Sequence, residues 1–264
     1  MAGAVYPPLF GEYVEFCKCM LDYPNLDKYE SDDRLHYPTA LLPSLEFLHG
    51  IYTSGKLKLQ KAGFLKDYIL WFSEKENSEV REDAVRSDRF NDSYADRIYQ
   101  FFKNQGLENN TQPIKYVISE LIANIAEHSR CNRSVFAIRA NKRLNCIEAA
   151  FFDNGITIPG SFADAGIKRK SGECIREAVT GTSTKPEAGR GHGLPSTTKI
   201  LKEMNCDILI VSGQAAFYLN GTNKYLEEDT LYELDEPSKL NGTLVSFQMY
   251  LPTKKVDIYR PGYL

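Results

Sequence analysis

A glutamate and an asparagine one helical turn apart are the first residues of this sequence that could do chemistry together. Glu120 and Asn124 lie in the segment 118–129 (ISELIANIAEHS), where the i, i+4 spacing places both side chains on one helix face. An amide oxygen is a hard, neutral ligand for Mg²⁺, and a carboxylate can accept a proton from an attacking nucleophile. Solvated helix faces have the same composition, so the pair by itself does not establish a site.

The second motif is the segment 151–159 (FFDNGITIP), in which Asp153 follows an apolar run. A carboxylate at the end of a strand can accept a hydrogen bond from an adenine amino group, and Gly155 permits close approach of a ligand. Asp-Asn-Gly is also a common turn sequence, so this motif too has an ordinary structural interpretation.

The third motif is a glycine-rich run directly before a predicted helix. It consists of Gly189, Arg190, Gly191, His192, Gly193 and Leu194. Alternate glycines let backbone N–H groups surround an oxyanion, and the N-terminus of the following helix adds its dipole. No strand precedes the run, as a dinucleotide fingerprint requires, and no Gly-Lys-Ser/Thr follows it, as a Walker loop requires.

The fourth motif, Asn241-Gly242-Thr243, opens the last predicted strand. Taken alone it is typical of a turn that begins a strand.

The elements that must position these motifs follow from apolar periodicity. We expect a helix from Ile114 to about Ser129, opened by Pro113, and a second long helix over 194–204. Strands are expected at 134–140, 146–152, 207–211, 214–219 and 243–251, with a short helix at 173–179. This order predicts an α/β (α+β) fold, a two-layer sandwich with a mainly antiparallel or mixed sheet. The long segment 153–192 is interpreted as a functional lid.

The first 105 residues have a different texture, with aromatic-rich stretches between charged runs. The segments 41–52 and 64–72 show mixed helix-like spacing, and 95–102 is predicted to be an amphipathic helix. We therefore expect a smaller regulatory or interaction domain at 1–105, of uncertain fold, before an ATP-binding domain at 106–264.

The totals exclude several classes of protein. With 42% hydrophobic and 25% charged residues, the chain of 264 residues has the composition of a soluble globular protein. A net charge of −3 is unfavourable for nucleic-acid binding, and no run of about 18 uncharged apolar residues suggests a membrane span. The six scattered cysteines and the absence of a signal-peptide pattern favour reduced thiols in the cytoplasm. Cys17-x-Cys19 lacks the further ligands that a zinc site needs.

The four motifs occur in one order, with a segment of lid length between the second and third. In this order the sequence resembles the GHKL superfamily, which groups gyrases, heat-shock chaperones, histidine kinases and MutL proteins around the Bergerat fold. The resemblance covers about residues 110–252. The four motifs look like the N, G1, G2 and G3 boxes in turn, and the segment 182–186 (TSTKP) is similar to lid sequences of histidine kinases.

The resemblance implies that the chain binds ATP with Mg²⁺. Asn124 would ligate the Mg²⁺ that bridges the phosphates, and Asp153 would read the adenine amino group. Gly155 would lie behind the base, and Thr243 would support Asp153 through a water. One departure is Thr157, which stands where the G1 box usually has a second glycine.

The phosphate end of the pocket would be closed by the glycine-rich run and the lid. The resemblance implies that Gly189, Gly191 and Gly193 close on the phosphates, within the run that also holds Arg190, His192 and Leu194. Lys185 in the lid would reach the γ-phosphate.

Glu120 discriminates between members of the family. Histidine kinases usually carry an amide at this position, whereas gyrases, heat-shock chaperones, MutL proteins and anti-sigma-factor serine kinases carry a glutamate. The segment 119–129 is closest in texture to the anti-sigma-factor serine kinases and related stand-alone bacterial ATP-binding proteins. A carboxylate here could act as the general base for water or for a protein hydroxyl.

Two hypotheses of different classes follow. In the first, the protein is an enzyme that hydrolyses ATP or transfers its γ-phosphate to a serine or threonine of a partner protein. In the second, it is a switch whose lid closes on ATP and thereby controls partner binding or dimerisation, with slow hydrolysis or none. Both expect a protein partner, and neither expects a membrane or a nucleic acid.

Overall fold

The computed structural model describes residues 6–22, 37–40, 42–43, 69–74, 92–181, 193–221 and 229–259. The helices are α1 (Pro8–Asp22), α4 (Asp92–Asn104), α5 (Thr111–His128), α6 (Ile158–Asp164), α7 (Ser171–Thr180) and α8 (Gly193–Glu203), with short 3₁₀ turns η5 (Glu108–Asn110) and η6 (Glu236–Ser238). The strands are β1 (Ile69–Glu74), β2 (Arg133–Asn141), β3 (Cys146–Asp153), β4 (Cys206–Gly213), β5 (Ala215–Leu219), β6 (Asp229–Glu233) and β7 (Leu240–Tyr250).

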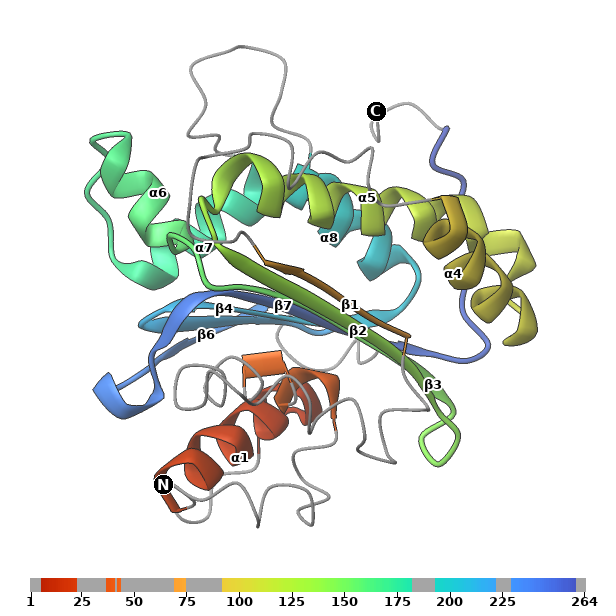
Figure 1. The fold of residues 1–264 in the computed structure, drawn as a ribbon, viewed down its shortest axis with the longest axis horizontal. Helices are drawn as coiled ribbons and strands as arrows, with labels where there is room; N and C mark the ends of the chain where they lie inside the picture. The colour runs from red at the N-terminus through yellow and green to blue at the C-terminus, as the bar shows by residue number, and fades with distance from the viewer. Residues whose placement is uncertain are drawn as a thin grey trace.

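One seven-stranded sheet forms the middle of the molecule. Its strand order is β1-β2-β3-β7-β4-β5-β6, and every neighbouring pair is antiparallel. The helices α4, α5, α7 and α8 lie over one face, and α1 lies under the other (Figure 1). The expected α+β class and antiparallel sheet are therefore confirmed. The two expected layers are present, and α1 adds a third.

The helix-side face of the sheet packs against an amphipathic α5. Pro113 is tolerated in the first turn of α5, and the helix buries a stripe that includes Val117, Leu121 and Ile122. The core beneath it also contains Phe136, Phe151 and Phe247 from three adjacent strands. This packing fixes the helix that carries Glu120 and Asn124 over the centre of the sheet.

The opposite face of the sheet is covered by α1. Phe10 stacks on Tyr232 of β6 with ring centroids 3.8 Å apart, and the Tyr13 hydroxyl donates to the Ser238 carbonyl at 2.7 Å. Leu9, Phe10 and Tyr13 are buried in a second apolar core together with outward-facing residues of the strands. The sequence analysis did not predict α1.

Most expected elements form within a few residues of the expected bounds, including the amphipathic helix at 95–102, which is part of α4. The helix-like interpretation of the segment 64–72 is wrong, because its apolar run Ile69–Phe72 lies in strand β1. A short continuous apolar run suits a strand as well as a helix, so spacing could not decide. The segment 153–192, expected to be irregular apart from one helix, holds α6 as well as α7.

The described N-terminal elements are integrated with the rest of the chain. β1 pairs with β2 along its whole length, and Ile98 and Phe102 of α4 belong to the helix-side core. The expected domain boundary at 105–106 stays a prediction, and the segment 41–52 lies mostly outside the described residues.

Two further expectations concern the chain as a whole. The six cysteines are buried thiols, and none forms a disulfide. No helix in the described ranges has the length and apolar character needed to cross a bilayer.

Candidate functional site

A row of polar side chains crosses four adjacent strands at one end of the sheet. Its members are Ser134 on β2, Asp153 on β3, Thr243 on β7 and Ser212 on β4, each in register with its neighbour. Each lies two residues from a member of the helix-side core, namely Phe136, Phe151, Val245 and Ile210. Because side chains alternate along a strand, the whole row faces the helix layer.

Asp153 is the buried carboxylate of this row. The residue is 4% exposed, and its Oδ1 accepts a hydrogen bond from the Gly155 N–H at 2.9 Å. Burial raises the pKa of Asp153 from 3.8 to about 7, against the opposing effect of the Gly155 hydrogen bond. The carboxylate is therefore short of donors, and an N–H group from a ligand would stabilise its charged form.

Two glycines let the backbone close tightly around Asp153. A Cβ on Gly155 would lie 1.9 Å from the Ser129 carbonyl oxygen, and one on Gly242 would lie 1.9 Å from the Asp153 carbonyl oxygen. Gly242 also has φ of +120°, which L side chains rarely adopt. Steric contact within the protein thus explains both glycines, whether or not a ligand binds.

Thr243 and Ser212 form the next part of the row. Their hydroxyl oxygens are 3.0 Å apart, and Ser212 Oγ also accepts the Ile158 N–H at 2.8 Å. Ser212 therefore ties β4 and β7 to the start of α6. The expected support of Asp153 by Thr243 through a water stays a prediction.

Thr157, the departure from the G1 pattern, has a structural role. It is the N-cap of α6, and its hydroxyl accepts the Gly160 N–H at 3.0 Å. Pro159 follows in the first turn of that helix, where proline is well tolerated. A glycine at position 157 would lose this cap, so the threonine is explained by α6.

Glu120 and Asn124 lie at the start of α8. A Cβ on Gly193 would be 3.0 Å from Glu120 Oε2 and 3.0 Å from Asn124 Oδ1. Both side chains are half-buried, and Leu194 packs against the helix-side core. The two side chains thus face the N-terminus of α8, where unpaired N–H groups and the helix dipole favour an anion.

Tyr116 precedes Glu120 by one turn of α5, and Ser196 lies in the first turn of the neighbouring α8. Burial, and then the charge of Glu120, raises the pKa of Tyr116. Glu120 and Ser196 are thus the two polar side chains that act on the Tyr116 hydroxyl, one from α5 and one from α8.

The two parts of the site are joined by α5. Its C-terminal end reaches the turn after β3, where the Ile156 N–H donates to the Ser129 carbonyl at 2.6 Å. Asn124 and Glu120 precede Ser129 by five and nine residues, which corresponds to about 8 Å and about 14 Å of helix rise. The carboxylate of Asp153 and the pair at Gly193 thus mark two ends of one helix–sheet boundary.

The remaining expected site residues lie outside the described residues. These are Lys185, Gly189, Arg190, Gly191 and His192. They belong to the segment that connects α7 to α8.

A metal ion at this site would depend on Asn124 as its protein ligand. Within the described ranges, no three His, Cys, Asp or Glu side chains gather where they could hold a metal. An amide oxygen suits Mg²⁺, which usually keeps several waters and binds through substrate phosphates. The residues present therefore fit a metal carried by a phosphorylated ligand, and they do not form a protein cage.

Four residues of the site were missed by the sequence analysis, namely Tyr116, Ser134, Ser196 and Ser212. Ser134 is the least expected, because its hydroxyl oxygen is buried and has no hydrogen-bond partner in the described structure. It lies beside Asp153 in the register of β2 and β3. Only that register, and not the residue type, distinguishes it from an ordinary strand serine.

Replacing Asp153 by asparagine should stabilise the ligand-free protein increasingly as the pH rises. Between pH 3.8 and about 7 the native Asp153 holds a proton that the unfolded chain has lost, because its pKa is raised. The wild type therefore loses roughly 4 kcal/mol of stability across this window, and the variant does not. Denaturant unfolding of both proteins at about pH 4 and about pH 7.5 measures the difference.

Asp164→Asn is the matched control, because Asp164 is exposed and pairs with Arg130 at 2.8 Å. The difference in stability between Asp164→Asn and the wild type should not grow as the pH rises. Equal effects of Asp153→Asn at both pH values would contradict the burial argument.

Comparison of the chain with protein-family models, curated proteins and solved structures finds no match. The arrangement of these residues is therefore the evidence on which a function must rest.

Proposed function

We propose that the chain binds Mg-ATP in a Bergerat-type pocket between α5, the N-terminus of α8 and the helix-side face of the sheet. The observation that carries the proposal is the approach of both Glu120 and Asn124 to Gly193, at the end of the glycine-rich run. A solvated helix face would give no such contact. The approach of the two side chains to Gly193 brings a proton acceptor, a metal ligand and a helix N-terminus to one place.

The adenine ring would bind at the Asp153 end of the pocket. The ionised carboxylate has an oxygen that can accept the exocyclic amino group, and it has few donors of its own. Gly155 and Gly242 keep the backbone close around this carboxylate, so that its position does not depend on the ligand. Preorganisation of this kind reduces the cost of binding.

The phosphates would lie at the N-terminus of α8. Backbone N–H groups of the first turn are unpaired within a helix and attract phosphate oxygens. Asn124 would hold the Mg²⁺, which neutralises charge on the phosphates when bound. Lys185 and the rest of the glycine-rich run would close this end from the lid.

Glu120 would act as the general base. Its carboxylate takes a proton from water or from a serine or threonine hydroxyl. The oxygen of the deprotonated water or hydroxyl bonds to the γ-phosphorus. At the same time the bond from the γ-phosphorus to the β,γ-bridging oxygen breaks, so that ADP leaves. The Tyr116 hydroxyl, which lies near both Glu120 and Ser196, would orient the carboxylate by donating to it.

The binding proposal is tested with Asp153→Asn at about pH 8, where the wild-type carboxylate is ionised. Loss of a charge-assisted hydrogen bond should weaken ATP and ADP binding by about 1.5–3 kcal/mol, or roughly 10- to 150-fold. Titration calorimetry measures both proteins, with the exposed Asp164→Asn as control. Unchanged affinity would remove Asp153 from the site, and absence of ATP binding by the wild type would overturn the proposal.

The catalytic proposal is tested with Glu120→Gln and γ-labelled ATP. We expect phosphate release or transfer to fall by about 100-fold or more, while ATP affinity changes little, because the amide cannot accept the proton. Glu127→Gln, an exposed position on the same helix, is the control. Label on a partner protein indicates a kinase, and free phosphate indicates hydrolysis. If Glu120→Gln leaves both unchanged, Glu120 is not the base, and the nucleotide acts as a switch.

The unpartnered hydroxyl of Ser134 predicts that a bound ligand, or a water bound with it, forms a hydrogen bond to Ser134 next to Asp153. Ser134→Ala should weaken ATP binding by about 2- to 12-fold, the value of one neutral hydrogen bond. Ser246→Ala is a close control, because Ser246 Oγ is equally buried and unpartnered within the described ranges, but it lies on the opposite face of the sheet. Equal effects of the two variants on affinity would show that Ser134 has no part in binding.

A further inference from the structure

A second polar row crosses the sheet on the face that α1 covers. Arg139 on β2, Glu148 on β3, Gln248 on β7 and Asp207 on β4 are in register with one another. Glu148, Gln248 and Asp207 are each 3% exposed or less. This row belongs to none of the chemistry proposed above, since it lies on the other side of the sheet.

Glu148 is well supplied with donors. Its carboxylate accepts Arg139 Nε at 2.6 Å and Asn141 Nδ2 at 2.7 Å, and Gln248 Nε2 lies 3.4 Å from its Oε1. The guanidinium of Arg139 also lies 4.7 Å from the Tyr37 ring centroid. The one strong cation of the row is therefore already engaged by Glu148.

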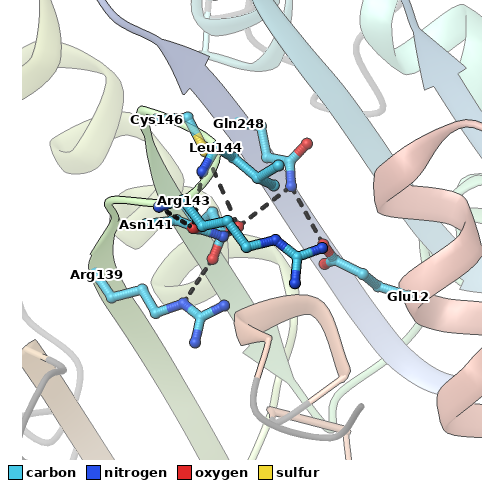
Figure 2. Close-up of polar contacts among 8 residues, drawn as sticks. Glu12, Arg139, Asn141, Arg143, Leu144, Cys146 and Gln248 are labelled. Atoms are coloured by element: carbon cyan, nitrogen blue, oxygen red, sulfur yellow. Dashed lines mark hydrogen bonds and ion pairs between the residues drawn. The ribbon is translucent and has the colours of Figure 1, made fainter. Parts of the chain in front are cut away.

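Glu12 comes from α1, and its carboxyl group has few hydrogen-bond donors. Figure 2 shows its side chain extending from the helix toward Gln248, whose Nε2 donates to Glu12 Oε1 at 3.2 Å. The residue as a whole is half-buried, but Oε2 is buried and has no hydrogen-bond partner among the described residues. One amide nitrogen thus serves two carboxylates, and a carboxylate oxygen is left without a donor.

The surrounding charges also oppose ionisation of Glu12. Burial and then the charge of Glu148 raise its pKa well above 4.5, whereas the nearby Thr39 hydroxyl and the charge of Arg139 act in the other direction. Arg139, which Glu148 already engages, is the one cation that acts on Glu12 among the described residues. Cys146 on β3 has its pKa raised to about 12, and the pKa of Tyr250 on β7 is raised by burial and by Asp207, so both stay neutral.

We propose that Glu12 is a proton-dependent latch for α1: its carboxyl group is neutral while the helix lies on the sheet, and transfer of that proton to solvent releases the helix. A charged, unpaired carboxylate is costly to bury and is well solvated in water. The released state therefore becomes more favourable as the pH rises. The apolar contacts of Leu9, Phe10 and Tyr13 set the strength of docking, and Glu12 makes it depend on pH.

Release of α1 would expose a large apolar area of the sheet. The residues that α1 covers include Val211, Ala216 and Leu244. The proposal is independent of ATP binding, because it concerns the opposite face of the sheet.

The test is hydrogen exchange of the full chain, followed by mass spectrometry of peptides from 8–22 between about pH 5.5 and about pH 8.5. After correction for intrinsic exchange, opening of α1 should increase up to about tenfold per pH unit, the limit for one proton, until the native pKa is passed. Peptides from β3 and β7 serve as the internal reference for global unfolding.

Glu12→Gln removes the ionisable carboxyl group and keeps the shape of the side chain, so α1 should open to the same extent at every pH. At about pH 8.5, α1 of this variant should be more protected than α1 of the wild type. Glu15→Gln is the control on the same helix, since Glu15 is only partly buried and pairs with Lys18 at 2.6 Å. It should keep the wild-type pH dependence. The proposal is overturned if Glu12→Gln keeps that dependence too, or if β3 and β7 open together with α1.

Discussion

The register of β3 is the constraint on which both polar rows depend. Every residue of β3 is buried, because helices cover one face of the sheet and α1 covers the other. Its odd-numbered residues, ending at Asp153, face α5 and α8, and its even-numbered residues, including Glu148, face α1. A slip of one residue would exchange the two sets. Pairing with β2 on one side and β7 on the other holds the register in place.

The two buried carboxylates of β3 differ in how many hydrogen-bond donors they have. Glu148 is neutralised by Arg139 and bound by two amides, so it is a satisfied structural group. Asp153 has a single backbone donor and no ion pair in the described ranges, and burial raises its pKa to about 7. A buried acid left short of partners destabilises the fold, and such groups gather at sites where a ligand supplies what is missing. The Asp153 side of the sheet is therefore the side on which a donor from a ligand would stabilise a buried carboxylate.

The sequence could predict the elements with long periodic patterns, such as α5 and α8, and the strands that bear the motifs. It could not predict β1, because Ile69–Phe72 is apolar at every position and carries no period. The start of α6 carries a sequence signal, because Thr157 is an N-cap residue type and Pro159 follows it in the first turn. Ser134 and Ser212 could not be found, because their importance arises only when four strands are placed in register. The approach of Glu120 to Gly193 likewise needs the packing of α5 on α8.

The edge strand β1 has a consequence for any attempt to study the C-terminal part alone. Its six residues pair with β2 from Arg133 to Ile138, so a fragment starting near residue 106 would present that ladder to solvent as an open edge. The same fragment would lack α1 and would leave Val135, Ala137 and Phe152 uncovered beside that edge. An unpaired strand next to an apolar surface is a template for sheet-to-sheet association between molecules. The preceding segment thus closes an edge and covers a face that the candidate-site part of the chain would otherwise leave open.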